Sequence, residues 1–327
     1  MNKTALTRRD LGALENFYDL DPTQDDFRSA VLDGLGHRQK AISSKFFYDQ
    51  RGSQLFDAIT ELPEYYPTRT EIGILRRYAR EIEAAVGLEP VVVEFGAGSV
   101  VKIRLLLDAL RAPVFVPIDI SREHLVRSSR ELAADYADTR VIAICADFTR
   151  DIVLPADLPT KNRLGFFPGS TLGNFTRDEA ARFLERTRAT LGPGSAFLIG
   201  IDLRKDEETL HAAYNDSQDV TAAFNLNLLR RINREIGATF DLTKFRHEAP
   251  WVQEKGRIEM RLISTESQSV IVAEQRFHFA AGEHIHTENS HKYDVEEFQA
   301  LARGAGYDPS KVWVDDAQRF SLHYLKA

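Results

Sequence analysis

Four apolar stretches of the sequence are each followed by small or polar residues of the kind that contact a bound ligand. Gly96 and Gly98 follow VVVEF, Asp119 ends PVFVPID, Asp147 follows RVIAICA, and Asn174 closes RLGFFPGSTLGN. If these stretches are parallel strands of one sheet, their carboxyl ends meet at one edge, which is where such sheets bind ligands. The spacing therefore predicts a ligand site that includes these five residues.

The turn after VVVEF indicates a ligand that contains a nucleotide. A dinucleotide fingerprint has the form G-x-G-x-x-G, and this turn has Gly96 and Gly98 but Val101 at the third position. Asp119 strengthens the interpretation, because a carboxylate at the end of the next strand can accept hydrogen bonds from both ribose hydroxyls. NAD and S-adenosylmethionine both carry such a ribose, so these residues leave both cofactors open.

The dipeptide Asp147–Phe148 favours one of the two cofactors. A carboxylate at this strand end can accept a hydrogen bond from the adenine amino group, and the aromatic ring can stack on the adenine. Dehydrogenases have no standard need for such a pair here, whereas methyltransferases commonly do. We therefore expect S-adenosyl-L-methionine as the ligand of Gly96, Gly98, Asp119, Asp147 and Phe148.

The segments around these turns predict the sheet that positions them. From PVVVEFGAG to SAFLIGIDL, short apolar strands alternate with helical stretches such as REHLVRSSRELAADY and RDEAARFLERTRATL, which indicates a parallel sheet covered by helices. A helix over VEEFQALARGAGYDP then precedes two strands, SKVWVDD and RFSLHYLKA. A terminal hairpin whose last strand is antiparallel resembles the methyltransferase version of the doubly wound fold. The expected class is α/β, a class I methyltransferase Rossmann-like sheet.

Residues 1 to about 85 are expected to form helices and loops. DFRSAVLDGLG and QLFDAITEL have helical spacing, and EIGILRRYAREIEAAVG is typical of one longer amphipathic helix that ends at Gly87. After Asp206 the strand–helix alternation stops and returns only near the tail. The strand–helix pattern is thus interrupted between the central part of the chain and its tail.

Composition limits the classes of protein that this chain can represent. Its 327 residues suit roughly two domains, and a formal net charge of −7 argues against a nucleic-acid partner, which normally requires a basic face. Cys145 is the single cysteine, which excludes an internal disulfide and suits a reducing compartment. No apolar run reaches the ~18 residues of a membrane span, and no signal peptide is visible. We expect a cytoplasmic monomer that does not bind membranes.

Several longer segments together resemble one enzyme family. KFFYDQRGSQLFDAITELPEYYPTRTE, FFPGSTLGNFTRDEAARFL, AYNDSQDVTAAFNLNLLRRINREIGATFD, RIEMRL and TENSHKY are similar to segments of the L-histidine Nα-methyltransferases of ergothioneine biosynthesis, in the same order. The resemblance implies transfer of three methyl groups to the histidine α-amine, through the mono- and dimethyl forms, which yields hercynine. It also implies a methyltransferase domain over 70–205 and 295–327, and a second, α+β, substrate-binding domain over 17–69 and 206–294.

The resemblance assigns roles to individual positions. Tyr65 and Glu288 would hold the imidazole, Asn174 and Tyr214 the carboxylate, and Tyr48 and Gly169 would lie beside the amine. Tyr48, Gly169 and Asn174 would form the catalytic set. The full expected substrate set is Tyr65, Asn174, Tyr214, Met260, Glu288 and Ser290, and the cofactor set is Gly96, Gly98, Lys102, Asp119, Asp147 and Phe148. Lys102 would meet the methionyl carboxylate of the cofactor, unless it is an ordinary solvated lysine.

Other interpretations stay open at this point. In EHIHTENSH, a strand would place His284, His286, Glu288 and Ser290 on one face, and a His-His-carboxylate set suits non-haem iron. Two ligands at strand spacing are weak evidence, so we expect no metal. The same fold acting on tryptophan or tyrosine is a further alternative, although Glu288 would be poorly used in an indole or phenol pocket. A non-catalytic binding protein is the third.

Overall fold

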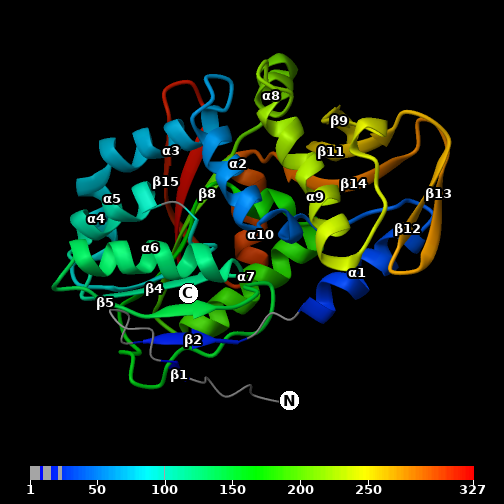
Figure 1. The fold of residues 1–327 in the computed structure, drawn as a ribbon. Helices are drawn as coiled ribbons and strands as arrows, with labels where there is room; N and C mark the ends of the chain where they lie inside the picture. The colour runs from blue at the N-terminus through cyan, green and yellow to red at the C-terminus, as the bar shows by residue number, and fades with distance from the viewer. Residues whose placement is uncertain (1–7, 10–15, 21–23, 99) are drawn as a thin grey trace. The chain divides into compact units, whose positions relative to one another are not determined.

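The computed structural model describes residues 8–9, 16–20, 24–98 and 100–327 (Figure 1). The chain divides into two compact units, each of which contains more than one segment. The first unit contains Pro67–Arg204 and Lys292–Ala327 together with the described residues before Thr23, and the second contains Thr23–Tyr66 and Lys205–His291. The chain therefore leaves the first unit twice and returns to it twice.

The first unit is built on one mixed sheet. Its strands run in the order β1–β2–β6–β4–β3–β7–β8–β16–β15, with β5 beside β4. Neighbouring strands from β2 to β8 are parallel, and β16 is antiparallel to both β8 and β15. The predicted fold class is therefore confirmed. The strand bounds are β1 Arg8–Arg9, β2 Phe17–Asp19, β3 Val91–Phe95, β4 Val114–Asp119, β5 Arg140–Val141, β6 Ala143–Cys145, β7 Arg163–Phe167, β8 Ala196–Asp202, β15 Asp308–Val314 and β16 Phe320–Lys326.

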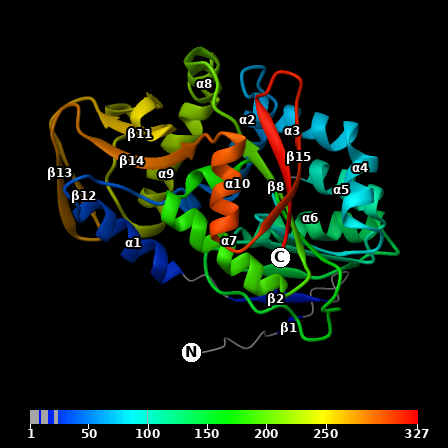
Figure 2. The ribbon, with the colours of Figure 1, turned by 180° about the vertical axis from the view of Figure 1, so that it is seen from behind.

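Helices cover both faces of this sheet, which explains why its strands are apolar without alternation. On one face, Val92 packs in a core with Leu106, and on the other Val93 packs in a core with Phe183. Figure 2 shows α7 and α10 together on the second face. The helices of the first face are α3 Tyr66–Arg77, α4 Ala79–Val86, α5 Val100–Leu110 and α6 Arg122–Asp135, and those of the second are α7 Arg177–Leu191 and α10 Val295–Gly304.

Three local expectations are wrong. The first 85 residues do contain strands, since β2 pairs in parallel with β6 and buries Phe17 completely. Three residues are too few to show a period in the sequence. The expected helix over 71–87 is two helices, because Tyr78 leaves helical geometry at φ −104° and ψ 15°. The strand expected over 140–145 is interrupted at Ile142, which separates β5 from β6.

The second unit packs helices against antiparallel strands. Strands β10, β11 and β14 form a sheet in that order, β9 also pairs with β11, and β12 pairs with β13. One face of the sheet shares a core with α1, α2, α8 and α9. Its elements are α1 Gln24–Gly36, α2 Gln50–Thr60, α8 Glu207–Tyr214, α9 Val220–Ile236, β9 Phe245–Glu248, β10 Trp251–Val252, β11 Arg257–Ser264, β12 Gln268–Val272, β13 Gln275–Phe279 and β14 His284–His291.

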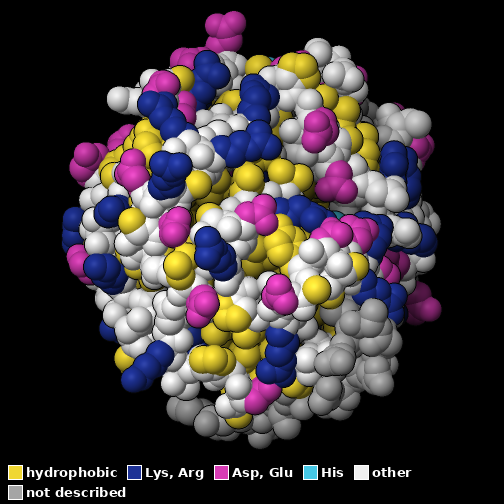
Figure 3. Space-filling model, turned by 90° about the vertical axis from the view of Figure 1, so that its left-hand side faces the viewer, with side chains coloured by type: hydrophobic (Ala, Val, Ile, Leu, Met, Phe, Trp, Pro, Cys, Tyr) yellow, Lys and Arg dark blue, Asp and Glu magenta, His cyan; other side chains and the backbone are white. Residues whose placement is uncertain are grey.

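The surface carries charges of both signs. On the face in Figure 3, Lys and Arg side chains are interspersed with Asp and Glu side chains, and this mixed pattern differs from the basic face of a nucleic-acid-binding domain. Among the residues that the structure describes, no helix has the length and apolarity needed to span a membrane.

Candidate active site

The glycine turn after β3 lies directly against the loop that follows β6. Gly96 has a φ of +73°, in the left-handed region that favours glycine, and its N–H donates to the Ile118 carbonyl oxygen at 2.8 Å. A Cβ at this position would lie 3.3 Å from Cε1 of Phe148. Gly98 follows, and its N–H donates to the Gly96 carbonyl oxygen. The turn and Phe148 therefore form a cradle that a larger residue at position 96 would fill.

Two carboxylates follow neighbouring strands beside this turn. Asp119 ends β4, and the Ser121 N–H donates to its Oδ1 at 2.7 Å. Burial raises the pKa of the Asp119 carboxyl above its ordinary value, and the hydrogen bond from Ser121 opposes that rise. Asp147 follows β6, and Thr149 donates to its Oδ1 through the backbone N–H at 2.9 Å and the hydroxyl at 2.6 Å. Local hydrogen bonds thus fix both carboxylates.

Lys102 is not a solvated surface lysine. It lies in the first turn of α5 with 4% of its surface exposed, and its Nζ is 2.7 Å from Oε2 of Glu71. Glu71 is fully buried in α3, and the same Oε2 accepts the Gly169 N–H at 2.8 Å. Sequence reasoning missed Glu71, although it closes the distinctive tract LPEYYPTRTE, because no local period connects it to either partner.

The turn after β7 has a constrained backbone. Gly169 and Ser170 both have positive φ values, +80° and +57°, and the second is an unusual conformation for a serine. The Asp202 N–H donates to the Ser170 hydroxyl oxygen at 2.9 Å, so β8 holds the turn from one side while Glu71 holds it from another. Asn174 ends the short 3-10 helix Thr171–Asn174 that follows.

Glu94 is a second buried acid that the sequence analysis did not single out. It lies in β3 with 1% of its surface exposed. Burial raises its pKa well above the ordinary value, Lys102 lowers it, and the nearby Asp119 and Glu71 raise it further. Glu94 is therefore grouped with Glu71, Asp119 and the buried Lys102 in the first unit.

The remaining candidate residues lie in the second unit, against its helix-covered core. Tyr65 and Met260 are buried in this core, and Tyr48 packs edge-on against the ring of Phe56 at 5.8 Å between ring centroids. Tyr214 and Ser290 are within hydrogen-bonding distance, with 2.6 Å between their hydroxyl oxygens. The structure thus brings together Tyr48, Tyr65, Tyr214, Met260, Glu288 and Ser290 within one unit.

A β-bulge decides which residues of β14 face that core. Met260 pairs with Glu288 and Arg261 pairs with His286, so Thr287 is an extra residue without a partner of its own on β11. Directly paired residues point to the same face, and consecutive residues of β11 point to opposite faces. Glu288 therefore shares the face of Met260, whereas His286 shares the face of Arg261. The expectation that His284, His286, Glu288 and Ser290 share one face is wrong.

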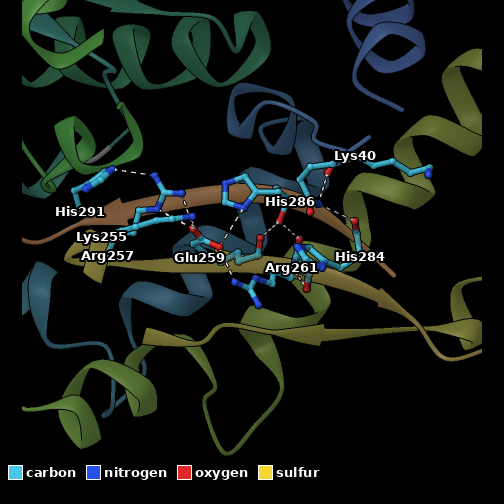
Figure 4. Close-up of polar contacts among 12 residues, drawn as sticks. Lys40, Lys255, Arg257, Glu259, Arg261, His284, His286 and His291 are labelled. Atoms are coloured by element: carbon cyan, nitrogen blue, oxygen red, sulfur yellow. Dashed lines mark hydrogen bonds and ion pairs between the residues drawn. The ribbon is translucent and has the colours of Figure 1, made fainter. Parts of the chain in front are cut away.

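The opposite face carries an ion-pair cluster centred on Glu259 (Figure 4). Its carboxylate lies 3.0 Å from Lys255 Nζ, 2.5 Å from an Arg257 nitrogen and 2.7 Å from an Arg261 nitrogen. Burial raises the pKa of the Glu259 carboxyl, but hydrogen bonds from these three cations outweigh burial and hold it well below its usual value. Burial lowers the pKa of His286, on this same face, to about 4.

The residues present fit S-adenosylmethionine and do not form the iron site considered above. The cradle at Gly96, the buried Lys102 and the carboxylate of Asp119 offer a small backbone surface, a cation and a ribose acceptor in one unit. The proposed iron ligands instead point to opposite faces of β14. Across the described ranges, no three His, Cys, Asp or Glu side chains are grouped to hold a metal ion.

The strand order and the residues at the strand ends define a class I S-adenosylmethionine-dependent methyltransferase. Within this class, residues 27–327 match the family described as "Histidine-specific methyltransferase, SAM-dependent", and the chain belongs to that family. The predicted family and the predicted cofactor are therefore confirmed.

The names of similar proteins are consistent with this family. The chain is 41% identical to the histidine N-alpha-methyltransferase of Mycolicibacterium smegmatis, over 95% of this chain and 98% of that protein. It is 39% identical to the histidine N-alpha-methyltransferase of Mycobacterium tuberculosis, over 90% of this chain and 93% of that protein. It is 32% identical to ergothioneine biosynthesis protein 1 of Neurospora crassa, over 89% of this chain and 33% of that protein.

Proposed function

We propose that this enzyme transfers methyl groups from S-adenosylmethionine to the α-amine of L-histidine, three times, to give hercynine as the first step of ergothioneine biosynthesis. The observation that carries the proposal is 41% identity to a histidine N-alpha-methyltransferase over nearly the full length of both chains. The family match over residues 27–327 agrees with it.

The first unit supplies the proposed cofactor residues. Asp119 accepts hydrogen bonds from the ribose, Asp147 and Phe148 bind the adenine, and Lys102 takes the methionyl carboxylate. Gly96 and Gly98 let the backbone approach the cofactor without a side chain between them. Support comes from the Gly96 cradle and from the place of Lys102 in the first turn of α5, the helix that follows the glycine turn.

The proposed substrate roles are those that the family resemblance assigns to each residue. In the second unit, Glu288 and Tyr65 bind the imidazole, Tyr214 binds the carboxylate, and Met260 and Ser290 complete the set. Tyr48 orients the amine. In the first unit, Asn174 binds the carboxylate and Gly169 lies beside the amine. Support comes from the placement of Met260 in β11 and of Glu288 and Ser290 in β14 on one face of the sheet, with Ser290 within hydrogen-bonding distance of Tyr214.

These residue types suit repeated methylation of one nitrogen. When bound, S-adenosylmethionine supplies a methyl group on a positively charged sulfur that is already activated for displacement. The protein then has mainly to orient a neutral amine and exclude water, which is catalysis by proximity and orientation. A protonated amine has no lone pair, so the α-ammonium group of histidine must lose a proton before the methyl transfer, and the site has to favour the neutral amine. The Tyr48 hydroxyl, the Asn174 amide and the Gly169 backbone carry no fixed charge, so they tolerate each successive form of the nitrogen.

The oligomeric state and the compartment are further proposals. We propose a cytoplasmic monomer with a small-molecule substrate and no nucleic-acid partner. The single cysteine, Cys145, is buried, and burial raises its thiol pKa to about 12, so it is unreactive in a reducing compartment. The mixed charge of the face in Figure 3 also favours a small-molecule substrate over nucleic acid.

Mass spectrometry of the products tests the proposed function. Incubation with histidine and S-adenosylmethionine should give masses that rise by one, two and then three methyl groups. No fourth should follow, because a trimethylated nitrogen has no lone pair. Tryptophan and tyrosine in parallel reactions test the alternative substrates. Fragmentation that places a methyl group on a ring nitrogen would contradict the amine placement, and faster methylation of tryptophan or tyrosine would contradict the substrate.

A further inference from the structure

Glu71 connects two parts of the first unit that have different proposed roles. Its Oε2 is 2.7 Å from Lys102 Nζ, and it also accepts the Gly169 N–H at 2.8 Å. The side chains of Glu71 and Lys102 are 0% and 5% exposed. The two partners are also close to each other, because a Cβ at Gly169 would lie 3.6 Å from Lys102 Nζ. One carboxylate oxygen therefore fixes both the lysine and the turn.

The surrounding strand makes room for this carboxylate. A Cβ at Gly200, in β8, would lie 2.1 Å from Oε1 of Glu71, so only glycine at this position leaves the carboxylate where it is. Oε1 is buried and has no hydrogen-bond partner among the residues that the structure describes, which is costly for a charged group. The geometry thus commits Glu71 to the two contacts of Oε2.

Each contact has a consequence for the proposed reaction. An ammonium has three N–H donors, and Glu71 orients Lys102 by accepting one of them, which leaves donors for a cofactor carboxylate. On the other side, Ser170, next to Gly169, has a left-handed φ of +57°, a conformation that a serine keeps only when its surroundings hold it. The bond from Glu71 to the Gly169 N–H is one of the contacts that hold this turn.

We propose that Glu71 is a positioning residue that links cofactor binding to alignment of the acceptor amine. It aims the Lys102 ammonium at the methionyl carboxylate and fixes the Gly169 turn beside the amine. This inference rests on the roles of Lys102 and Gly169 in the proposed function. In this proposal Glu71 acts through these two partners and is not itself a catalytic residue.

A double-mutant cycle on cofactor affinity tests the link to Lys102. Glu71→Gln keeps the shape of the side chain and removes its charge, so we expect S-adenosylhomocysteine affinity to fall at least about tenfold, or ~1.4 kcal/mol. In a Lys102→Met background the same change should alter affinity by less than about twofold, because coupled residues are non-additive. Isothermal titration calorimetry measures all four dissociation constants. Additive effects would overturn the link to Lys102.

Steady-state kinetics tests the link to the turn. With cofactor and histidine both saturating, Glu71→Gln should lower kcat by at least about tenfold, because a misaligned amine loses the advantage of orientation. The KM for histidine should change by less than about twofold, since the residues proposed to bind imidazole are untouched. An unchanged kcat would overturn this half of the proposal.

Glu259→Gln is the matched control. Glu259 is also a carboxylate buried to 4% exposure and held by cations, but it lies in the second unit. Its replacement should lower the melting temperature and leave S-adenosylhomocysteine affinity within about twofold, because the lost ion pairs are made within the second unit and include none of the residues proposed to bind the cofactor. If Glu71→Gln behaves in the same way, its role is structural only and the proposal is overturned.

A second variant covers the case in which Glu71→Gln does not fold. Glu71→Asp keeps the charge but is one methylene shorter, so it should lose the contact to Lys102 or to Gly169 and lower affinity or kcat. Wild-type values for both would overturn the proposal. The calorimetry needs no substrate, and the wild-type product assay needs no variant. Failure of the proposed function and failure of the role of Glu71 are therefore distinguishable.

Discussion

The two units place their candidate residues by different rules. In the first unit, Gly96, Asp119 and Asp147 follow the carboxyl ends of parallel strands, so their position depends only on where each strand ends. In the second unit, Met260, Glu288 and Ser290 lie within strands, so the face each one occupies depends on the register of every residue between them.

One extra residue in a strand changes which side chains of the second unit face its core. One extra residue in a turn would hardly move the strand-end residues of the first unit. The bulge at Thr287 puts Glu288 on the core face and His286 on the opposite face, although simple alternation would put both on one face. A site at strand ends tolerates an error of one residue in a turn. A site within a strand does not, because a slip of one residue exchanges its faces.

The largest expected effect tests whether a residue at a strand end of the first unit binds the cofactor. Asp119→Ala should lower S-adenosylhomocysteine affinity at least about 100-fold, because two hydrogen bonds to a charged group are lost at ~1.5–3 kcal/mol each. Calorimetry measures the affinity, and Asp135→Ala, which removes an exposed ion pair with Arg104, is the control. An affinity within about threefold of wild type would show that the ribose is held elsewhere.

The second-largest expected effect tests whether the two faces of β14 have different roles. Glu288→Ala should raise the KM for histidine at least tenfold, because one charge-assisted hydrogen bond is worth ~1.5–3 kcal/mol. His286→Ala, two residues away on the opposite face, should leave this KM within about twofold. Steady-state kinetics with histidine and phenylalanine measures both variants, and discrimination against phenylalanine should narrow only in Glu288→Ala. Equal effects of the two substitutions on the KM for histidine would mean that the bulge does not place Glu288 and His286 on opposite faces of β14.

A moderate effect is expected for the bulge residue itself. Thr287 is 1% exposed, and its hydroxyl donates to Asn225 Oδ1 at 2.8 Å. Thr287→Val leaves that oxygen without its donor, so the free energy of unfolding should fall by about 1–3 kcal/mol. Urea denaturation measures the change, and Thr265→Val, at an exposed position, should change it little. The prediction fails if both variants are equally stable.

The smallest effect is a change in pH dependence. Burial lowers the pKa of His286 from 6.5 to about 4, although Glu259 opposes the shift. Between these values the unfolded chain binds the proton and the folded chain does not, so the free energy of unfolding falls as pH decreases from 6.5 to about 4. His286→Gln should flatten this part of the stability curve. Urea denaturation across the range measures it, and an unchanged slope in the variant would contradict the assignment.

The sequence could predict features that depend on where a strand ends better than features that depend on how strands pair. The strands that end at Asp119 and just before Gly96 and Asp147 are clear apolar runs followed by turn residues. The sheet and its ligand-binding edge were therefore predictable. The strand at Phe17–Asp19 was not, because three residues carry no period and their partner β6 is distant in sequence. The bulge at Thr287 was also hidden, since it appears only when β14 is paired with β11.

Glu71 shows a second limit of sequence reasoning. Its partners, Lys102 and Gly169, lie on other elements, and nothing in the helical pattern of α3 distinguishes it from an exposed glutamate. The resemblance to a family identified the residues with assigned roles. The residue that connects two of them emerged only from the folded arrangement.

The position of β16 has a consequence for how the protein is made. β16 lies between β8 and β15, and Asp202 pairs with Phe320, so the whole second segment of the second unit is synthesised between the two partners. Until β16 leaves the ribosome, β8 presents an unpaired edge, and β15 has no strand to join. Such edges are templates for aggregation, and pairings so distant in sequence form slowly. The nascent chain therefore exposes an open sheet edge for longer than a chain whose sheet closes in the order of synthesis.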